Sequence, residues 1–166
     1  MTYLTTSLTD QKTNISFQKT TVTSHQDVTT SWTLIEGGQM SYTPSSSSAE
    51  IMVEFTTSFG RKDGVVSLLT RLQVGDTVGT LGDVVTDNID YYNGFGGSRS
   101  ASWATNVSDI ITLKYKLAGW SGSKIIQVQC TVFNNNSGME SIVNGTRALS
   151  TTDVKLFNPF MKIYEL

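Results

Sequence analysis

Cysteine, histidine and proline are scarce in this sequence of 166 residues, which contains one Cys, one His and two Pro. The single cysteine, Cys130, cannot form a disulfide within the chain, so stability must come from packing or from association between copies. One histidine and one cysteine are also too few for the ligand set of a usual zinc site. The sequence therefore excludes a disulfide scaffold and a common zinc site, and it suits synthesis in a reducing cytoplasm.

Charge is sparse as well. Charged residues make up 16% of the chain and the net charge is −2. Lysine and arginine form no cluster, so the basic face that nucleic-acid binding requires is missing from the sequence. No apolar run approaches the ~20 residues of a membrane-spanning helix, and the first residues lack the basic and apolar regions of a signal peptide. We expect no nucleic-acid partner and no membrane insertion.

Groups with catalytic potential are isolated. His25 has Asp27 two residues away, but residues i and i+2 of a strand merely share a face, which does not make a catalytic triad. Cys130 falls among inward-facing valines and is expected to be a core residue. Three aspartates gather in a glycine-rich region and could act as glycosidase carboxylates or calcium ligands, although solvated turn residues are the preferred interpretation; they are Asp83, Asp87 and Asp90. We expect no enzyme, no cofactor and no metal site.

Short alternating segments dominate what is present. Residues 50–59 place Ile51, Val53 and Phe55 on one face, and residues 111–117 and 124–133 alternate in the same way. No segment shows the 3.6-residue period of a helix. About eight to ten short strands in one domain predict a sandwich, a jelly roll or a barrel. We favour an all-β, jelly-roll-like antiparallel β-sandwich.

Turn residues predict local connections between these segments. Gly37 and Gly38 predict a turn between a strand ending at Ile35 and a second strand ending at Thr43. "DG" at 63–64 predicts a hairpin that joins 50–59 to 65–74, and "GWSGS" at 119–123 predicts a hairpin between the segments on either side. Pro159 within the last strand predicts an edge or a bulge there.

Residues 1–30 are rich in Thr, Ser and Gln and have few apolar positions. They predict an extended N-terminal arm or edge strands ahead of a β-sandwich domain over residues 31–166, and a frayed terminus is the alternative. An arm could dock on another protein. The side chains that would make this contact are Tyr3, Leu4, Leu8, Ile15 and Phe17.

Aromatic residues form two further groups of interest. Tyr91, Tyr92, Phe95 and Trp120 lie at or beside glycine-rich turns, where exposed rings could bind a glycan or a protein receptor, or else fold back over the end of the sandwich. A second group surrounds Pro159 and is a candidate subunit interface, with an ordinary core strand as the alternative. Its members are Phe157, Phe160, Ile163 and Tyr164.

Three stretches, taken in order, resemble tailed-bacteriophage virion proteins. "SWTLIEGGQMSYTPSSSSAEIMVEF" contains a strand with Glu36 and Gly37, a corner of Pro44 and Ser45–Ser48, and then an apolar strand. "KYKLAGWSGSKIIQVQCTVF" resembles a later hairpin of these proteins, and "VNGTR" followed by "MKIYEL" resembles their C-terminal end. The resemblance covers residues 32–166 and includes capsid decoration (knob) proteins and tail-fibre tip domains.

This resemblance implies a β-sandwich that trimerises on the outside of a phage particle. Because residues 1–30 alone precede the resembling region, we expect a decoration protein that its N-terminal arm holds on the major capsid protein or another virion protein. The alternative is a tail-fibre tip or accessory adhesin that binds a receptor or a host surface glycan. A polysaccharide-degrading enzyme that uses the three aspartates is a third alternative.

Overall fold

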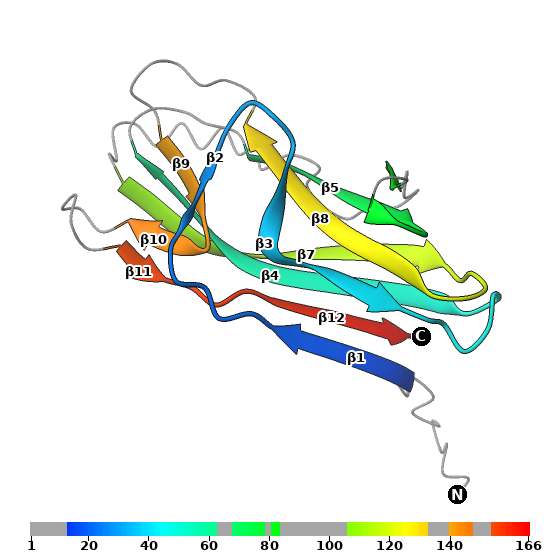
Figure 1. Ribbon diagram of the computed structural model, residues 1–166. Coiled ribbons are helices and arrows are strands. Elements are labelled where there is room, and N and C mark those ends of the chain that lie inside the picture. Colours follow the sequence, from blue (N-terminus) through cyan, green and yellow to red (C-terminus); the bar gives the residue numbers. More distant parts are fainter. Residues whose placement is uncertain (1–12, 63–67, 79–80, 84–105, 133–139, 148–153) are drawn as a thin grey trace, which may run out of the picture.

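A computed structural model describes residues 13–62, 68–78, 81–83, 106–132, 140–147 and 154–166. Within these ranges the chain forms twelve β-strands and no α-helix, and every recorded strand pairing is antiparallel. Two sheets enclose a common core (Figure 1). The prediction of an all-β, antiparallel sandwich-like fold is confirmed.

The larger sheet, sheet A, is organised around its longest strands. Strand β4 (Glu50–Lys62) pairs along its whole length with β7 (Asn106–Ala118) on one side. On its other side, β4 pairs first with β12 (Phe160–Glu165) and then with β9 (Glu140–Val143). The outer strands are β1 (Thr13–Lys19), which pairs with β12, and β2 (Gln26–Val28), which pairs with β9.

Sheet B has the strand order β3-β8-β5-β6. Its members are β3 (Thr33–Tyr42), β8 (Lys124–Val132), β5 (Leu68–Gly75) and the two-residue β6 (Gly82–Asp83). A separate two-stranded ladder joins β10 (Gly145–Arg147) to β11 (Val154–Leu156). Sheet B lies across sheet A (Figure 1). Buried residues of both sheets form one hydrophobic core between them.

The predicted inward faces are confirmed. Ile51, Val53 and Phe55 of β4 are completely buried, and the alternate residues of β7 and β8 are buried as well. The fully buried residues of β8 are Ile126, Val128 and Cys130. Each large apolar side chain of this kind contributes ~1.5–3 kcal/mol on leaving water, so the two facing sets account for the association of the sheets.

Both predicted hairpins were wrong. β4 belongs to sheet A and β5 to sheet B, and the same division separates β7 from β8. The segments at 63–67 and 119–123 therefore connect strands of different sheets, and the supposed later hairpin of the phage resemblance is such a connection as well. The reason is physical: alternation shows that a strand buries one face, but both sheets bury a face in the same core.

The predicted turn at Gly37 and Gly38 was also wrong, because β3 is continuous there and bulged. Leu34 pairs with Gln129 and Gln39 with Gln127, so residues 35–38 of β3 lie opposite one residue of β8. Gly37 has φ +82°, and a Cβ on it would lie 2.7 Å from Cγ of Pro159. Glycine is needed for this left-handed, crowded bulge, which a sequence pattern cannot distinguish from a turn.

Pro159 ends an irregular segment before β12, and β12 lies between β1 and β4 rather than at an edge. The prediction of an edge or a bulge at Pro159 was therefore wrong, because Pro159 precedes the strand and the register of β12 with β4 runs without a shift from Phe160. The Pro159 carbonyl accepts a hydrogen bond from the N–H of Thr20, at 2.9 Å. Val22 and Val28 are buried, so the chain that follows β1 packs into the sandwich.

Candidate functional site

The first strand of the structure carries exposed apolar side chains. β1 is the outermost strand next to β12 in the described part of sheet A, and none of its residues 14–19 is buried. Ile15 is 53% exposed and Phe17 is 61% exposed. The Phe17 ring lies 5.9 Å from that of half-buried Phe160, tilted by 38°. We call Ile15, Phe17 and Phe160 the N-terminal edge surface.

A buried carboxylate fixes the start of this strand. Asn14 Nδ2 donates to Glu165 Oε1 at 2.9 Å and to the Thr43 carbonyl at 3.1 Å. The backbone N–H and the hydroxyl of Ser45 donate to the same carboxylate, one to each oxygen. The Tyr42 hydroxyl donates to the Asn14 carbonyl at 2.8 Å. We call Asn14, Tyr42, Ser45 and Glu165 the Glu165 clamp, which joins β1, the end of β3 with its serine corner, and β12.

Hydrogen bonding sets the charge of this clamp. The bonds from Asn14 and then from Ser45 hold the pKa of Glu165 below its usual range, although burial of this 4% exposed residue acts in the opposite direction. Burial, followed by the Glu165 charge, raises the pKa of Tyr42 to about 12. At neutral pH the clamp therefore consists of a carboxylate that only accepts and a phenol that donates.

Asn14 suits its position for a second reason. Its φ is +46°, within the left-handed region that asparagine tolerates better than most residues. The register between β1 and β12 shifts between Thr13 and Ser16, which is a β-bulge at this point. The backbone of Asn14 therefore adopts the conformation of the bulge, and its side chain supplies the hydrogen bonds that anchor it.

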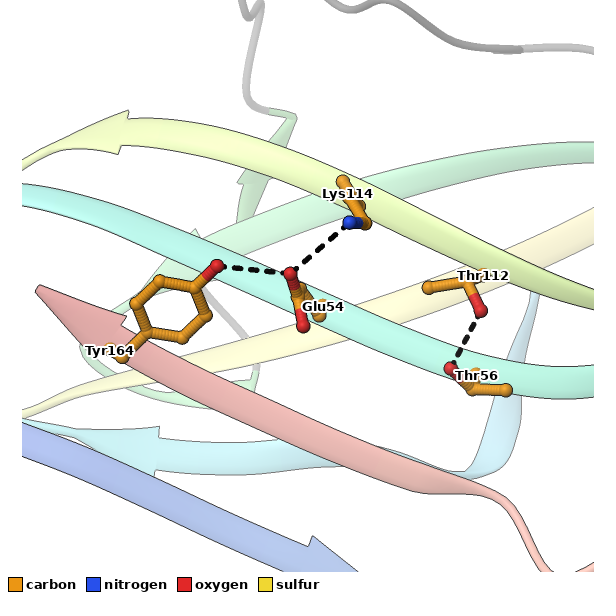
Figure 2. A network of polar contacts seen from close by, with 5 residues as sticks. All are labelled: Glu54, Thr56, Thr112, Lys114 and Tyr164. Carbon is orange, nitrogen blue, oxygen red and sulfur yellow. Dashed lines mark hydrogen bonds and ion pairs between the residues drawn. The ribbon is translucent and has the colours of Figure 1, made fainter. Parts of the chain in front are cut away.

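A network of polar contacts links β4 to its neighbours β7 and β12 (Figure 2). Glu54 accepts a hydrogen bond from the Tyr164 hydroxyl at 2.9 Å and pairs with Lys114 Nζ at 3.4 Å. Thr56 and Thr112 share a hydrogen bond of 2.9 Å across the same strand pair. Cross-strand pairs of this kind contribute ~0.2–1 kcal/mol each, so they stabilise the strand pairing but do not make a reactive site.

The structure separates the four residues of the predicted subunit interface. Ile163 is completely buried in the core, and Tyr164 is 3% exposed with its hydroxyl bound to Glu54. Phe157 is half-buried, and its N–H donates to the carbonyl of Asn144. Phe160 is the member that meets the predicted arm, through its contact with Phe17.

The other predicted groups are described only in part. Tyr3, Leu4 and Leu8 of the arm, Tyr91, Tyr92 and Phe95 of the loop set, and Asp87 and Asp90 lie outside the described residues. Trp120 packs against the core, with its ring edge-on to Tyr42 at 6.3 Å. Asp83 ends β6, where it pairs with Gln73.

Sequence reasoning missed the Glu165 clamp, although one signal was available. Met161 and Ile163 face the core, so alternation along β12 turns Glu165 inward as well. An inward carboxylate needs hydrogen-bond donors. Its partner Asn14 is 151 residues away, and no local pattern identifies it.

Groups with catalytic potential remain apart in the described structure. His25 Nε2 lies 3.6 Å from an Asp27 carboxylate whose side chain is 76% exposed. Cys130 is completely buried, and burial raises the pKa of its thiol to about 12. The described ranges hold no cluster of three or more His, Cys, Asp or Glu residues that could bind a metal ion. They likewise contain no helix with the length and hydropathy to cross a membrane.

Comparisons with protein-family models, curated proteins and solved structures find no match to this chain. The features that bear on function are the N-terminal edge surface, the Glu165 clamp that positions it, and the residues that resemble phage virion proteins.

Proposed function

We propose that this protein is a structural component of a tailed-bacteriophage particle. In this proposal it is a homotrimeric, non-enzymatic decoration protein with a jelly-roll-like sandwich. Its N-terminal region attaches it to the major capsid protein, or another virion protein, on the outside of the particle. The observation that carries the proposal is the N-terminal edge surface, where β1 presents Ile15 and Phe17 to solvent directly after residues 1–12.

Attachment through this surface is energetically reasonable. Covering a side chain the size of phenylalanine or isoleucine contributes ~1.5–3 kcal/mol. Because Phe17 and Ile15 are already 61% and 53% exposed, most of that contribution is still available to a partner. The Glu165 clamp holds the strand in place beforehand, so binding orders fewer groups and costs less entropy. Several such contacts in a trimer would add through effective concentration.

The interior of the fold supports a structural role over a catalytic one. The Cys130 thiol is buried and its raised pKa keeps it protonated at neutral pH, which removes its nucleophilic form. His25 lies 3.6 Å from a solvent-exposed Asp27 carboxylate, whereas a catalytic triad uses a buried carboxylate in hydrogen-bond contact.

The test measures co-sedimentation with empty capsids, and native mass reports oligomeric state. We expect the wild type to form trimers and to bind capsids. Phe17→Ser should weaken binding roughly tenfold or more, as expected for losing a large apolar contact. Ile110→Ser is the matched control, because Ile110 is 65% exposed on β7, which lies across β4 from β12 and β1. Equal binding by both variants would contradict attachment through β1.

A second variant examines the preceding residues. The triple change Tyr3→Ser, Leu4→Ser and Leu8→Ser should reduce capsid binding while the trimer persists. A protein that is monomeric and ignores capsids would refute the whole proposal. Adsorption of the protein to host cells, with no affinity for capsids, would favour the receptor-binding alternative.

A further inference from the structure

β1 is held to the fold differently from the other long strands of sheet A. Residues 14–19 are all exposed or half-buried, whereas β4, β7 and β12 each bury several side chains. The hydrophobic core contains residues of β4, β7 and β12 but none of β1. If β1 left the sheet, the core would therefore remain closed, and the main change would be an exposed edge on β12.

The attachments of β1 are mainly polar, and the ring contact of Phe17 with Phe160 lies on the surface. The backbone of β1 pairs with β12 through a ladder that a bulge interrupts, and Asn14 enters the Glu165 clamp. The chain that follows is firmly fixed: Thr20 N–H donates to the Pro159 carbonyl at 2.9 Å, and the N–H of buried Val22 donates to Asn158 Oδ1 at 3.1 Å. A natural boundary for local opening lies between β1 and Thr20.

We propose that β1 is an exchangeable strand, which leaves β12 while the sandwich stays folded and is replaced by β1 of a second copy. A second copy is the fitting occupant because it offers the same ladder and the same Asn14 amide to the Glu165 carboxylate. Exchange of an identical element re-forms every bond that it breaks, so it costs mainly association entropy. This inference is independent of capsid attachment.

Strand length limits the geometry of the exchange. Seven extended residues reach about 23 Å, so β1, anchored at Thr20, can reach a neighbouring β12 only within that distance. In the exchanged state Ile15 and Phe17 remain on the surface of the acceptor, since their exposed positions beside β12 are unchanged. The result is a pair or ring of copies that the N-terminal strands hold together.

The decisive experiment mixes two single variants, Phe17→Cys and Lys162→Cys, each with Cys130→Ala. Phe17 and Lys162 are directly opposite on β1 and β12, at the Cα separation of about 4.5–5.5 Å that suits a disulfide. A disulfide between positions 17 and 162 in this mixture requires β1 of one molecule to lie on β12 of another. A chain carrying both changes shows that the bond can form, and a mixture of Ile110→Cys with Lys162→Cys measures random collision.

The clamp provides the second measurement. Asn14→Gly keeps the left-handed backbone but removes the amide, so hydrogen exchange at the β1 amides should accelerate roughly tenfold or more, with β4 unchanged. Gln18→Ala, on the same strand, should leave exchange near the wild-type rate, because Gln18 is exposed, lies outside the clamp and donates a long hydrogen bond to Thr20, at 3.4 Å.

Cross-linking above the collision control, in the wild-type background or with Asn14→Gly, supports strand exchange. The proposal is overturned if neither mixture cross-links while the doubly substituted chain closes its disulfide. It is also overturned if β1 amides are protected as strongly as those of β4. Neither readout involves capsids, so failure here leaves the attachment proposal standing, and the reverse is also true.

Discussion

Neutralising Glu165 should destabilise the fold by a predictable amount. The carboxylate accepts short hydrogen bonds from Asn14 Nδ2 and from the N–H and hydroxyl of Ser45. A hydrogen bond to a charged group contributes ~1.5–3 kcal/mol and a neutral one ~0.5–1.5 kcal/mol, so each of the three bonds weakens by about 1 kcal/mol. Lower desolvation of a neutral amide offsets part of this. We expect Glu165→Gln to lower the free energy of unfolding by about 2 kcal/mol.

The pH dependence makes this prediction specific. The pKa of Glu165 is lower in the folded protein than its ordinary value because Asn14 and Ser45 donate to the carboxylate. Its contribution is therefore fully present above the unfolded pKa of about 4.3 and is lost as the pH falls through the folded pKa. The unfolding free energies of wild type and Glu165→Gln should differ at neutral pH and converge in acid.

Urea unfolding at a series of pH values from about 7 to about 3 measures both quantities. Glu50→Gln is the control, because Glu50 makes an exposed ion pair with Lys116 at 2.8 Å that contributes ~0–1 kcal/mol. If Glu165→Gln is as stable as Glu50→Gln at neutral pH, the Glu165 carboxylate does not stabilise the fold through its hydrogen bonds. A difference from wild type that stays constant into acid would lead to the same conclusion.

Three further substitutions test other parts of the fold. Gly37→Ala should lower the unfolding free energy by about 2–4 kcal/mol, because Gly37 has φ +82° and its new Cβ would meet a proline ring carbon at 2.7 Å. The control Gly122→Ala, at φ +79° with open space around it, should lower it by about 1 kcal/mol. Equal shifts in the thermal unfolding midpoint would contradict the steric argument. Asn144→Gly keeps φ near +60° but leaves the buried Thr57 hydroxyl without its 2.6 Å acceptor, so urea unfolding should show a loss of about 1–3 kcal/mol, and an unchanged midpoint would contradict it. Cys130 should not react with a thiol reagent at mildly alkaline pH until the protein unfolds, since it is buried and its pKa is raised to about 12; rapid labelling of the native protein would refute this.

The inward faces could be predicted from the sequence because a strand that buries one face must alternate. Ile51, Val53 and Phe55 follow that rule and are completely buried. The partners of those strands could not be predicted in this way. A turn signal such as "DG" predicts that the chain changes direction, but it contains no information on whether the next strand joins the same sheet or the opposite one.

Long sequence separation limited prediction of the candidate site. Ile15 and Phe17 could be proposed as contact residues because few apolar positions interrupt a polar segment. The clamp beside them joins Asn14 to Glu165 across 151 residues, and no short pattern connects such positions. Its serine corner was visible in the sequence, but the role of Ser45 as a donor to a buried carboxylate depends on the tertiary structure.

The way in which β1 is anchored bears on both proposals. A strand usually stays in a sheet because alternate side chains enter the core, and β1 buries none from Asn14 to Lys19. Backbone pairing, the charged clamp and a surface ring contact between Phe17 and Phe160 hold it instead. Ile15 and Phe17 stay more than half exposed and are available to bind another molecule. Because one ladder and one side-chain anchor can be broken without opening the core, the same arrangement permits exchange between copies. Weakening the clamp should therefore promote strand exchange and reduce the pre-ordering of β1 for attachment. We expect Asn14→Gly to raise the yield of cross-links between copies and to lower the amount of protein that co-sediments with capsids.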